Sequence, residues 1–309
     1  MKPFTERLPS AQWVDERSEY IGGSQVSAIL GESDYETPLQ VWLRKKELIP
    51  PVETTGIMEF GNLFEDVIAN FFEEETGFKT RKINQTYCHK EHSFLRANID
   101  RQVLASNGLE STAILEMKTT TSFRMKSLDW DPPRSWFLQC QHYLGILNYS
   151  TCFLQIYLRD TCQFMEPIKI ERDDELIAQN MAKLVEWWKL HMIGGKRPDP
   201  INGEDALILY PDSQPEEVVE ITPAGYGLYQ ELTEIRDKKS DLIKAEEHLK
   251  TQLKDKLGKA ERLVYSGETL VSWKSQSTTR LDTTTIKREH PEFYKQYSKT
   301  TKTRRFLCH

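Results

Sequence analysis

Two acidic residues and a lysine lie near the ends of two neighbouring strand-like segments, where their types and spacing could support metal-dependent chemistry. Asp100 closes the motif Asn98-Ile99-Asp100, and Glu116 and Lys118 lie two residues apart at the end of the next apolar run. Because side chains alternate faces along a strand, Glu116 and Lys118 would point the same way. Two carboxylates suit a hard cation such as Mg²⁺, and a lysine beside it can orient or deprotonate a water. The expected chemistry is cleavage of a phosphodiester bond.

Each of these residues also has a simpler structural interpretation. Glu116 and Lys118 could form an exposed ion pair on an edge strand, and Asp100 could be an aspartate in a turn at a strand end. Taken together the three residues fit a D…E-x-K pattern, which favours a common site over three separate structural roles.

Two further polar positions could complete such a site. Glu65 borders the apolar stripe of a helix expected over residues 57–76, from where it could add a metal ligand. A solvated surface charge is the more common role of a helical glutamate. In the apolar segment 136–144 either Gln139 or Gln141 must face inward. Leaving a buried amide unpaired costs about 1–3 kcal/mol, so the inward-facing glutamine needs hydrogen-bond partners. It could bind a water or the lysine in the site, or it could be an amide whose partners lie in the core.

A phosphate-binding position is conceivable near the start of the chain. Ser24 is expected to be the N-cap of a short helix over residues 25–30, and Arg17 precedes it by seven residues. Backbone N–H groups, a hydroxyl and a guanidinium can together bind a phosphate. Simple capping beside a surface arginine is the more common arrangement.

The segments around these residues predict an α/β domain with a central mixed β-sheet flanked by helices. Helices are expected over residues 25–30, 38–46, 57–76, 135–147 and 173–191, and strands over 78–87, 94–104, 113–118, 151–159 and 163–170. Helix, antiparallel strands, helix, strands and helix in this order are typical of a mixed sheet. Asn107-Gly108 predicts a hairpin turn between the two segments that carry the acids.

The sequence changes character after about residue 200, which predicts one domain over residues 1–205 and a C-terminal extension over 206–309. The extension contains a long amphipathic helix, residues 224–257, either alone or paired with another helix, and a β-hairpin over 261–273. Its tail interleaves basic and aromatic residues: Lys287, Arg288, Lys295, Lys299, Lys302, Arg304 and Arg305 with Phe293, Tyr294, Tyr297 and Phe306. Such a tail could bind a phosphate backbone and stack on bases, or be a solvated segment whose aromatics pack on the domain.

Composition sets outer limits. The chain has 309 residues and a formal net charge of −6, which argues mildly against a protein that coats nucleic acid but not against a nuclease. No apolar run approaches the ~20 residues of a membrane span, and the N-terminus lacks the apolar core of a signal peptide. The five cysteines are scattered and odd in number, which indicates free thiols. We therefore expect a cytoplasmic protein.

Several blocks in the chain resemble, in order, those of YqaJ-type viral recombinases, relatives of bacteriophage lambda exonuclease in the PD-(D/E)XK nuclease superfamily. The blocks are Arg17 with Ile21-Gly22-Gly23-Ser24, Phe60-Gly61-Asn62-Leu63-Phe64-Glu65, Asn98-Ile99-Asp100, Leu115-Glu116-Met117-Lys118-Thr119-Thr120, and Gln139-Cys140-Gln141. The match covers residues 17–170. The chain departs from the superfamily name because Ile99 stands where that name has proline, although the acid is retained.

The resemblance implies roles for individual residues. By position, Asp100, Glu116 and the Met117 carbonyl would bind Mg²⁺, for which Mn²⁺ can substitute, and Lys118 would orient or activate the attacking water. Glu65 would join the metal shell and Gln139 would position the water and the lysine. Arg17 and Ser24 would hold a DNA phosphate.

The resemblance also implies an activity and an assembly. The expected enzyme is a 5′→3′ exonuclease that digests linear double-stranded DNA and leaves 3′ single-stranded tails for phage-type recombination by single-strand annealing. It would form a ring-like homotrimer, bind a single-strand annealing protein and act in a bacterial host cell, encoded by a phage or prophage. Two alternatives stay open: a structure- or site-specific endonuclease on the same scaffold, and a module without catalysis that binds DNA or protein.

Overall fold

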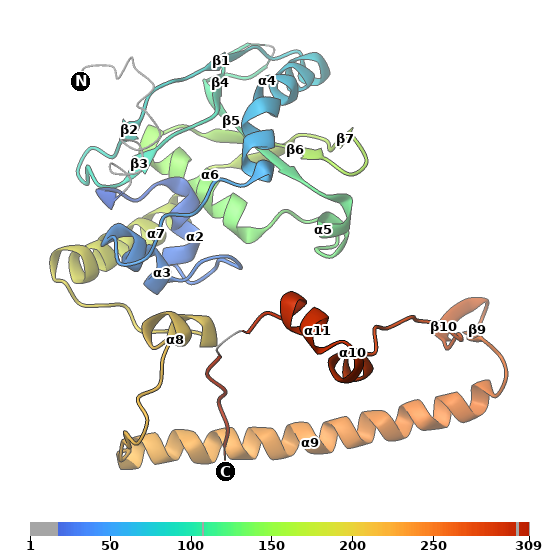
Figure 1. Cartoon of the computed structure of the whole chain (residues 1–309). Coiled ribbons are helices and arrows are strands. Elements are labelled where there is room, and N and C mark those ends of the chain that lie inside the picture. Colours follow the sequence, from blue (N-terminus) through green and yellow to red (C-terminus); the bar gives the residue numbers. More distant parts are fainter. Residues whose placement is uncertain (1–17, 107, 301–302, 309) are drawn as a thin grey trace. The chain divides into compact units, whose positions relative to one another are not determined.

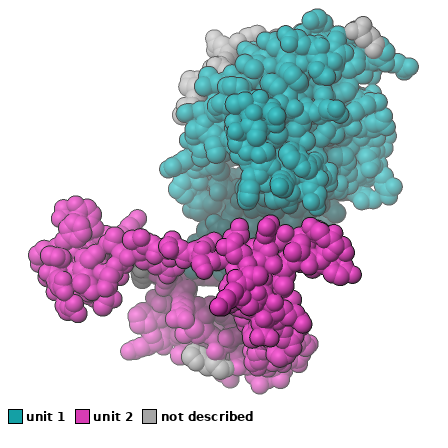
Figure 2. All heavy atoms as spheres, turned by 90° about the vertical axis from the view of Figure 1, so that its right-hand side faces the viewer, with its two compact units in different colours: residues 1–208 teal, residues 209–309 magenta. Residues whose placement is uncertain are grey.

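The computed structural model describes residues 18–106, 108–300 and 303–308. The chain forms two compact units, residues 1–208 and 209–309 (Figures 1 and 2). Each unit is described by itself below. The predicted boundary at residue 205, between two parts of the chain that fold independently, stays a prediction.

A six-stranded mixed sheet forms the centre of unit 1 (Figure 1). Its strand order is β1-β4-β5-β6-β7, with β8 also paired to β6. The strands are β1 Thr80–Lys82, β4 Arg101–Val103, β5 Ala113–Thr120, β6 Thr151–Leu158, β7 Gln163–Phe164 and β8 Ile168–Glu171. β5 and β6 run parallel and all other pairs run antiparallel. The prediction of a central mixed sheet flanked by helices is confirmed.

Two helices cover β5 from opposite faces. Helix α4, Gly56–Thr76, packs Ile68 and Phe72 into a core cluster that contains Leu115 and Met117 of β5. Helix α6, Arg134–Leu147, packs into a second cluster that contains Ile114 of the same strand. Odd-numbered side chains of β5 therefore face α4, and even-numbered ones, including those of Glu116 and Lys118, lie on the α6 face.

The remaining elements of unit 1 surround this core. They are α2 Gly23–Ile29, α3 Pro38–Lys45, β2 Tyr87–Cys88, β3 Arg96–Ala97, α5 Ser122–Lys126, α7 Asp174–Trp187 with the π-helical η1 Trp188–Ile193, and α8 Gly203–Leu209. A buried hydrogen bond ties the start of α3 to α8, because the Thr37 hydroxyl donates to Asp205 Oδ1 at 2.7 Å. Asp205 is fully buried.

Several predicted boundaries are wrong. The strand expected over 94–104 is interrupted, so Asp100 stands just before β4 instead of near the end of a continuous strand. The strand expected over 163–170 divides into β7 and β8, and the helix expected over 173–191 continues as a π-helix. Ser24 is not an N-cap, because α2 begins at Gly23 with Gly22 as its cap. Asn107 of the predicted turn lies outside the described residues, while Gly108 has a φ of +88°.

Unit 2 contains the predicted long helix and hairpin. Helix α9 spans Pro223–Leu257, with Thr222 accepting a hydrogen bond from the Gly225 N–H at its start. The hairpin consists of β9 Arg262–Tyr265 and β10 Glu268–Ser272, and two short helices follow, α10 Thr283–Glu289 and α11 Pro291–Tyr297. The apolar stripe of α9 is open to solvent, since Leu228 and Leu242 are 70% and 71% exposed.

In the part of the chain that the structure describes, no helix combines the length and the apolar character needed to cross a membrane.

Candidate active site

The register of the β4–β5 hairpin brings the two acids together. Arg101 pairs with Leu115 in this antiparallel ladder, so the next position along each chain places Asp100 beside Glu116. Since β4 begins only at Arg101, it does not pair with β5 at that point, and this edge of β5 is left without its neighbouring strand. The Asp100 carboxylate takes that place, and its Oδ2 accepts a hydrogen bond from the Met117 N–H at 2.8 Å.

Glu116, Lys118 and Gln139 form one hydrogen-bonded group on the α6 face of β5. Lys118 Nζ lies 2.7 Å from Glu116 Oε1 and donates to Gln139 Oε1 at 2.9 Å. The other end of the same amide, Gln139 Nε2, donates to Glu116 Oε1 at 2.7 Å. The glutamine therefore fixes the carboxylate and the ammonium relative to each other, and Glu116 is almost fully buried while the Lys118 side chain stays 20% exposed.

Tyr143, one helical turn after Gln139, supports this group from behind. Gln139 Nε2 also donates to the Tyr143 hydroxyl, at 3.0 Å. Helix α2 lies directly against that ring: a Cβ added at Gly23 would lie 2.7 Å from Tyr143 Cζ. The close approach of α2 thus depends on a residue without a side chain at position 23.

The electrostatics of the cluster are those of two buried carboxyl groups held close together. Burial, followed by repulsion from Glu116, raises the pKa of Asp100 well above its usual value. Burial lowers the pKa of Lys118, but attraction to Glu116 and Asp100 outweighs it, and the net pKa is raised. Lys118 is therefore an ammonium group at neutral pH.

Glu116 retains one unsatisfied atom that fits a cation. Its Oε2 is buried and has no hydrogen-bond partner among the described residues. A buried carboxylate oxygen without a partner is costly unless a cation or water meets it. Within one strand residue the N–H and C=O point to the same side, so the Met117 carbonyl faces the rim where Asp100 lies. Asp100, Glu116 and this carbonyl are all oxygen donors, which hard divalent cations prefer.

No third acid completes a cage at this point. Among the residues that the structure describes, no group of three or more His, Cys, Asp or Glu side chains is arranged to hold a metal ion. A cation here would need oxygen atoms from the backbone, from water or from a bound phosphate in addition to the two carboxylates.

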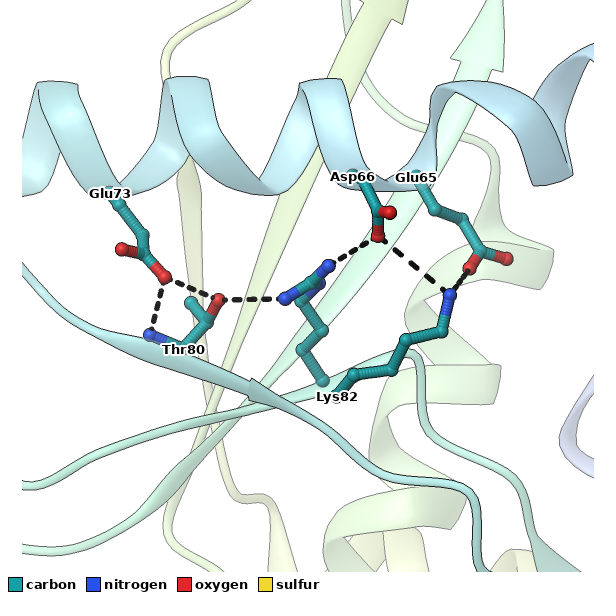
Figure 3. Close-up of polar contacts among 6 residues, drawn as sticks. Glu65, Asp66, Glu73, Thr80 and Lys82 are labelled. Atoms are coloured by element: carbon teal, nitrogen blue, oxygen red, sulfur yellow. Dashed lines mark hydrogen bonds and ion pairs between the residues drawn. The ribbon is translucent and has the colours of Figure 1, made fainter.

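Glu65 lies close by but is held by a different partner. It extends from α4 toward β1, where Lys82 Nζ lies 3.1 Å from its Oε2 (Figure 3). Its negative charge still contributes, as the smallest of the named causes, to the raised pKa of Asp100. The structure therefore places Glu65 at the edge of the cluster and outside its hydrogen-bonded centre.

Of the two residues predicted to bind a phosphate, the structure describes only Ser24. Arg17 lies outside the described residues, and Ser24 is exposed on the first turn of α2, beside the Gly23 that packs against Tyr143. The Gly22 N–H at the start of this helix is instead taken by Gln25 Oε1 at 3.4 Å.

Two glutamines with similar sequence surroundings have different roles. Gln139 faces the acids, whereas Gln141 is a satisfied core amide that donates to the Glu171 carbonyl at 2.7 Å and accepts from the Asp173 N–H at 3.0 Å. The sequence reasoning did not include Tyr143 or Lys82 in the site. A tyrosine four residues after an inward glutamine lies on the same helical face, and this spacing could have identified it.

The sequence comparisons place this chain in a known family. Residues 12–150 match the family described as the YqaJ-like viral recombinase domain. The YqaJ protein of Bacillus subtilis (strain 168) is 32% identical over 304 residues, which is 96% of this chain and 92% of that protein. The chain therefore belongs to the family of proteins with a YqaJ-like viral recombinase domain.

Solved structures of similar architecture are more distant. An alkaline exonuclease, LHK-Exo, from Laribacter hongkongensis shares 17% identity and a TM-score of 0.49, over 60% of this chain and 94% of that one. A putative exonuclease from Eubacterium rectale shares 11% identity and a TM-score of 0.44, over 70% and 96% of the two chains.

Proposed function

We propose that the chain is a metal-dependent deoxyribonuclease that removes nucleotides from the 5′ ends of linear double-stranded DNA and leaves 3′ single-stranded tails. The observation that carries this proposal is the buried Oε2 of Glu116, which has no hydrogen-bond partner among the described residues, in a cluster with Asp100 and the Lys118 ammonium group. The family description, a viral recombinase domain, agrees with an enzyme that processes DNA.

Mg²⁺ is the proposed cofactor, with Mn²⁺ able to substitute. Asp100, Glu116 and the Met117 carbonyl are the proposed ligands, and Glu65 is a further candidate. When bound, such an ion would stabilise the charge that develops on the phosphate and favour ionisation of the attacking water.

The protein's own residues have complementary tasks. Lys118 is proposed to orient or activate the attacking water and to stabilise negative charge on the phosphate oxygens. Gln139 keeps Lys118 and Glu116 at a fixed separation through its two ends. Tyr143 holds the amide of Gln139 in place. Arg17 and Ser24 are proposed to bind a phosphate of the DNA.

Exposed aromatic side chains in the C-terminal tail support a DNA contact. Phe293, Tyr297 and Phe306 are 54%, 70% and 82% exposed, as expected of aromatics available for stacking on bases. Lys302 of this tail lies outside the described residues.

The biological setting is part of the same proposal. We propose action inside a bacterial host cell during recombination by single-strand annealing, with an annealing protein that receives the 3′ tail and a homo-oligomer, a trimer by family resemblance, that encloses the duplex. Of the two open alternatives, a module without catalysis has little physical reason to keep a buried acid–acid–lysine set.

A nuclease assay on two duplex substrates tests the activity. A linear duplex labelled at its 5′ ends and a closed circular duplex are incubated with Mg²⁺, with and without a chelator. The proposal requires early release of the 5′ label as mononucleotides and an intact circle, both dependent on the cation. Nicking of the circle would identify the endonuclease alternative instead. No cleavage with either Mg²⁺ or Mn²⁺ would support the non-catalytic one.

A further inference from the structure

Lys82 of β1 lies between two carboxylates of α4 (Figure 3). Its Nζ is 3.1 Å from Glu65 Oε2 and 3.8 Å from Asp66 Oδ1, and the side chain is 41% exposed. Both acids are within ion-pair reach, so a small movement of the flexible lysine side chain could exchange one partner for the other.

The two carboxylates are not equivalent. Asp66 Oδ1 already pairs with Arg101 at 2.5 Å, and the Arg101 side chain is only 14% exposed. Among the described residues, Lys82 is the one cation that pairs with Glu65. Asp66 is thus fixed by the sheet, whereas the position of Glu65 depends on Lys82.

Besides Lys82, the Glu65 carboxylate has a second group that it can approach, the cluster of Asp100 and Glu116. Arg101, which directly follows Asp100, pairs with Asp66, the neighbour of Glu65 on α4, so this turn of α4 lies beside the acid cluster. Within the described ranges of the chain, the cluster has two carboxylates and no third one. A carboxylate that rotated away from Lys82 would therefore meet a site that is short of oxygen ligands.

We propose that Lys82 competes with the divalent cation for Glu65, so that Lys82 is a positioning residue that holds the third carboxylate out of the site until the cation binds. This inference rests on the proposed metal-dependent function. When Glu65 leaves, Lys82 moves to Asp66, which Arg101 keeps in place, so the lysine retains an ion pair in both states. The free enzyme consequently takes up metal less tightly than its ligand set allows.

Calorimetric titration of Mn²⁺ into the full-length protein without DNA tests the competition independently of cleavage. Lys82→Met should bind Mn²⁺ about two- to fivefold more tightly than the wild type, the range expected when an exposed ion pair no longer competes. The matched control is Lys79→Met, which removes a lysine paired with Glu73 of the same helix at 3.1 Å. This control should leave the affinity unchanged.

The same lysine substitution made in the Glu65→Gln variant distinguishes competition for Glu65 from the simple loss of a positive charge. In Glu65→Gln the further change Lys82→Met should have no effect on Mn²⁺ affinity, because the contested carboxylate is gone. A gain that persists in Glu65→Gln, or a Lys82→Met affinity equal to or weaker than that of the wild type, would overturn the inference. Thermal melts of each variant check that the fold is retained.

The result also distinguishes this inference from the proposed function. Wild-type uptake of Mn²⁺ that is lost in Glu116→Gln, together with an unchanged Lys82→Met affinity, removes only the role of Lys82. Absence of any Mn²⁺ uptake by the wild type contradicts the metal site itself and with it both proposals.

Discussion

Helices α6 and α9 show two different ways of using a helix in one chain. α6 has 14 residues and buries seven of them, including Gln139, His142 and Tyr143, whereas α9 has 35 residues and buries only Leu257. The polar side chains of α6 are consequently held by packing and by hydrogen bonds to fixed partners. Those of α9 are mostly exposed and are not held by packing, so chemistry that depends on sub-ångström placement belongs on α6.

The charged groups follow the same division. Near α6 the ion pair of Lys118 with Glu116 is largely buried, and its members also contact Gln139. On α9 the pairs are helical neighbours such as Lys250 with Glu246, whose side chains are 48% and 61% exposed. Exposed pairs of this kind contribute only about 0.3–0.5 kcal/mol each, whereas breaking a buried one costs several times more.

The largest expected difference is in catalysis. Glu116→Gln keeps the shape of the side chain but removes the negative charge, so we expect cleavage of linear duplex DNA to fall about a thousandfold or more, equivalent to about 4 kcal/mol of barrier. The matched change on α9, Glu246→Gln, should leave the rate unaltered. The measurement is the initial rate of nucleotide release, with circular dichroism melts as the folding control. Near-normal cleavage by Glu116→Gln would end the assignment of this cluster as the active site.

The next largest effect concerns acid stability. Burial lowers the pKa of His142 to about 4, below its usual value near 6.5 in an unfolded chain. The folded state therefore binds fewer protons, and the stabilisation is complete above about pH 6.5 and is lost as the pH falls toward 4, by about 3 kcal/mol in total. Denaturant unfolding between pH 7 and 4 should show a weaker decline in His142→Gln than in the wild type.

The control for that measurement lies on α9. His248 is exposed, and His248→Gln should leave the pH dependence of unfolding as it is in the wild type. Equal slopes for the wild type and His142→Gln would show that α6 does not bury a neutral histidine.

A pair of glycine substitutions compares the packing of the two regions directly. Gly23→Ala would force a methyl group against the Tyr143 ring, which we expect to cost about 1–3 kcal/mol. Gly227→Ala on α9 meets nothing within 4 Å and should stabilise the helix by up to about 1 kcal/mol. We expect chemical denaturation to show that the two substitutions change the free energy of unfolding in opposite directions. A destabilising Gly227→Ala would show that α9 is covered in solution.

The smallest expected effect is at the apolar stripe of α9. Leu242 is 71% exposed, and Leu242→Gln should change the free energy of unfolding by less than about 0.5 kcal/mol. A loss above 1 kcal/mol that grows with protein concentration would indicate that this stripe is buried between copies.

The strongly periodic parts of the fold could be predicted from the sequence. The apolar stripe of α4, the buried run of β6 and the long helix α9 each gave a repeated signal over many residues, and the mixed sheet follows from their order. Asp100, Glu116 and Lys118 could be grouped because the hairpin between them is short, and antiparallel pairing then determines which residues meet.

The rest depended on tertiary contacts that leave no local pattern. The break before β4 arises because Asp100 uses its side chain, instead of a strand partner, to satisfy the Met117 N–H. Ser24 has the residue type of an N-cap, but the close packing of Gly23 on Tyr143 starts the helix earlier. The ion pair of Glu65 with Lys82 joins a helix and a strand, and the two residues are 17 positions apart in the chain. At that separation the sequence alone does not indicate whether two side chains face each other.

The buried link between Thr37 and Asp205 determines where this chain can be shortened. The Asp205 carboxylate receives the Thr37 hydroxyl at 2.7 Å and the Ile201 N–H at 3.0 Å, so it anchors the beginning of α3 as well as the turn into α8. A fragment ending at residue 200 would remove the acceptor of that buried hydroxyl, while one ending after residue 210 would keep both carboxylate oxygens engaged. Fragments of unit 1 for crystallisation should therefore include α8 as their last helix.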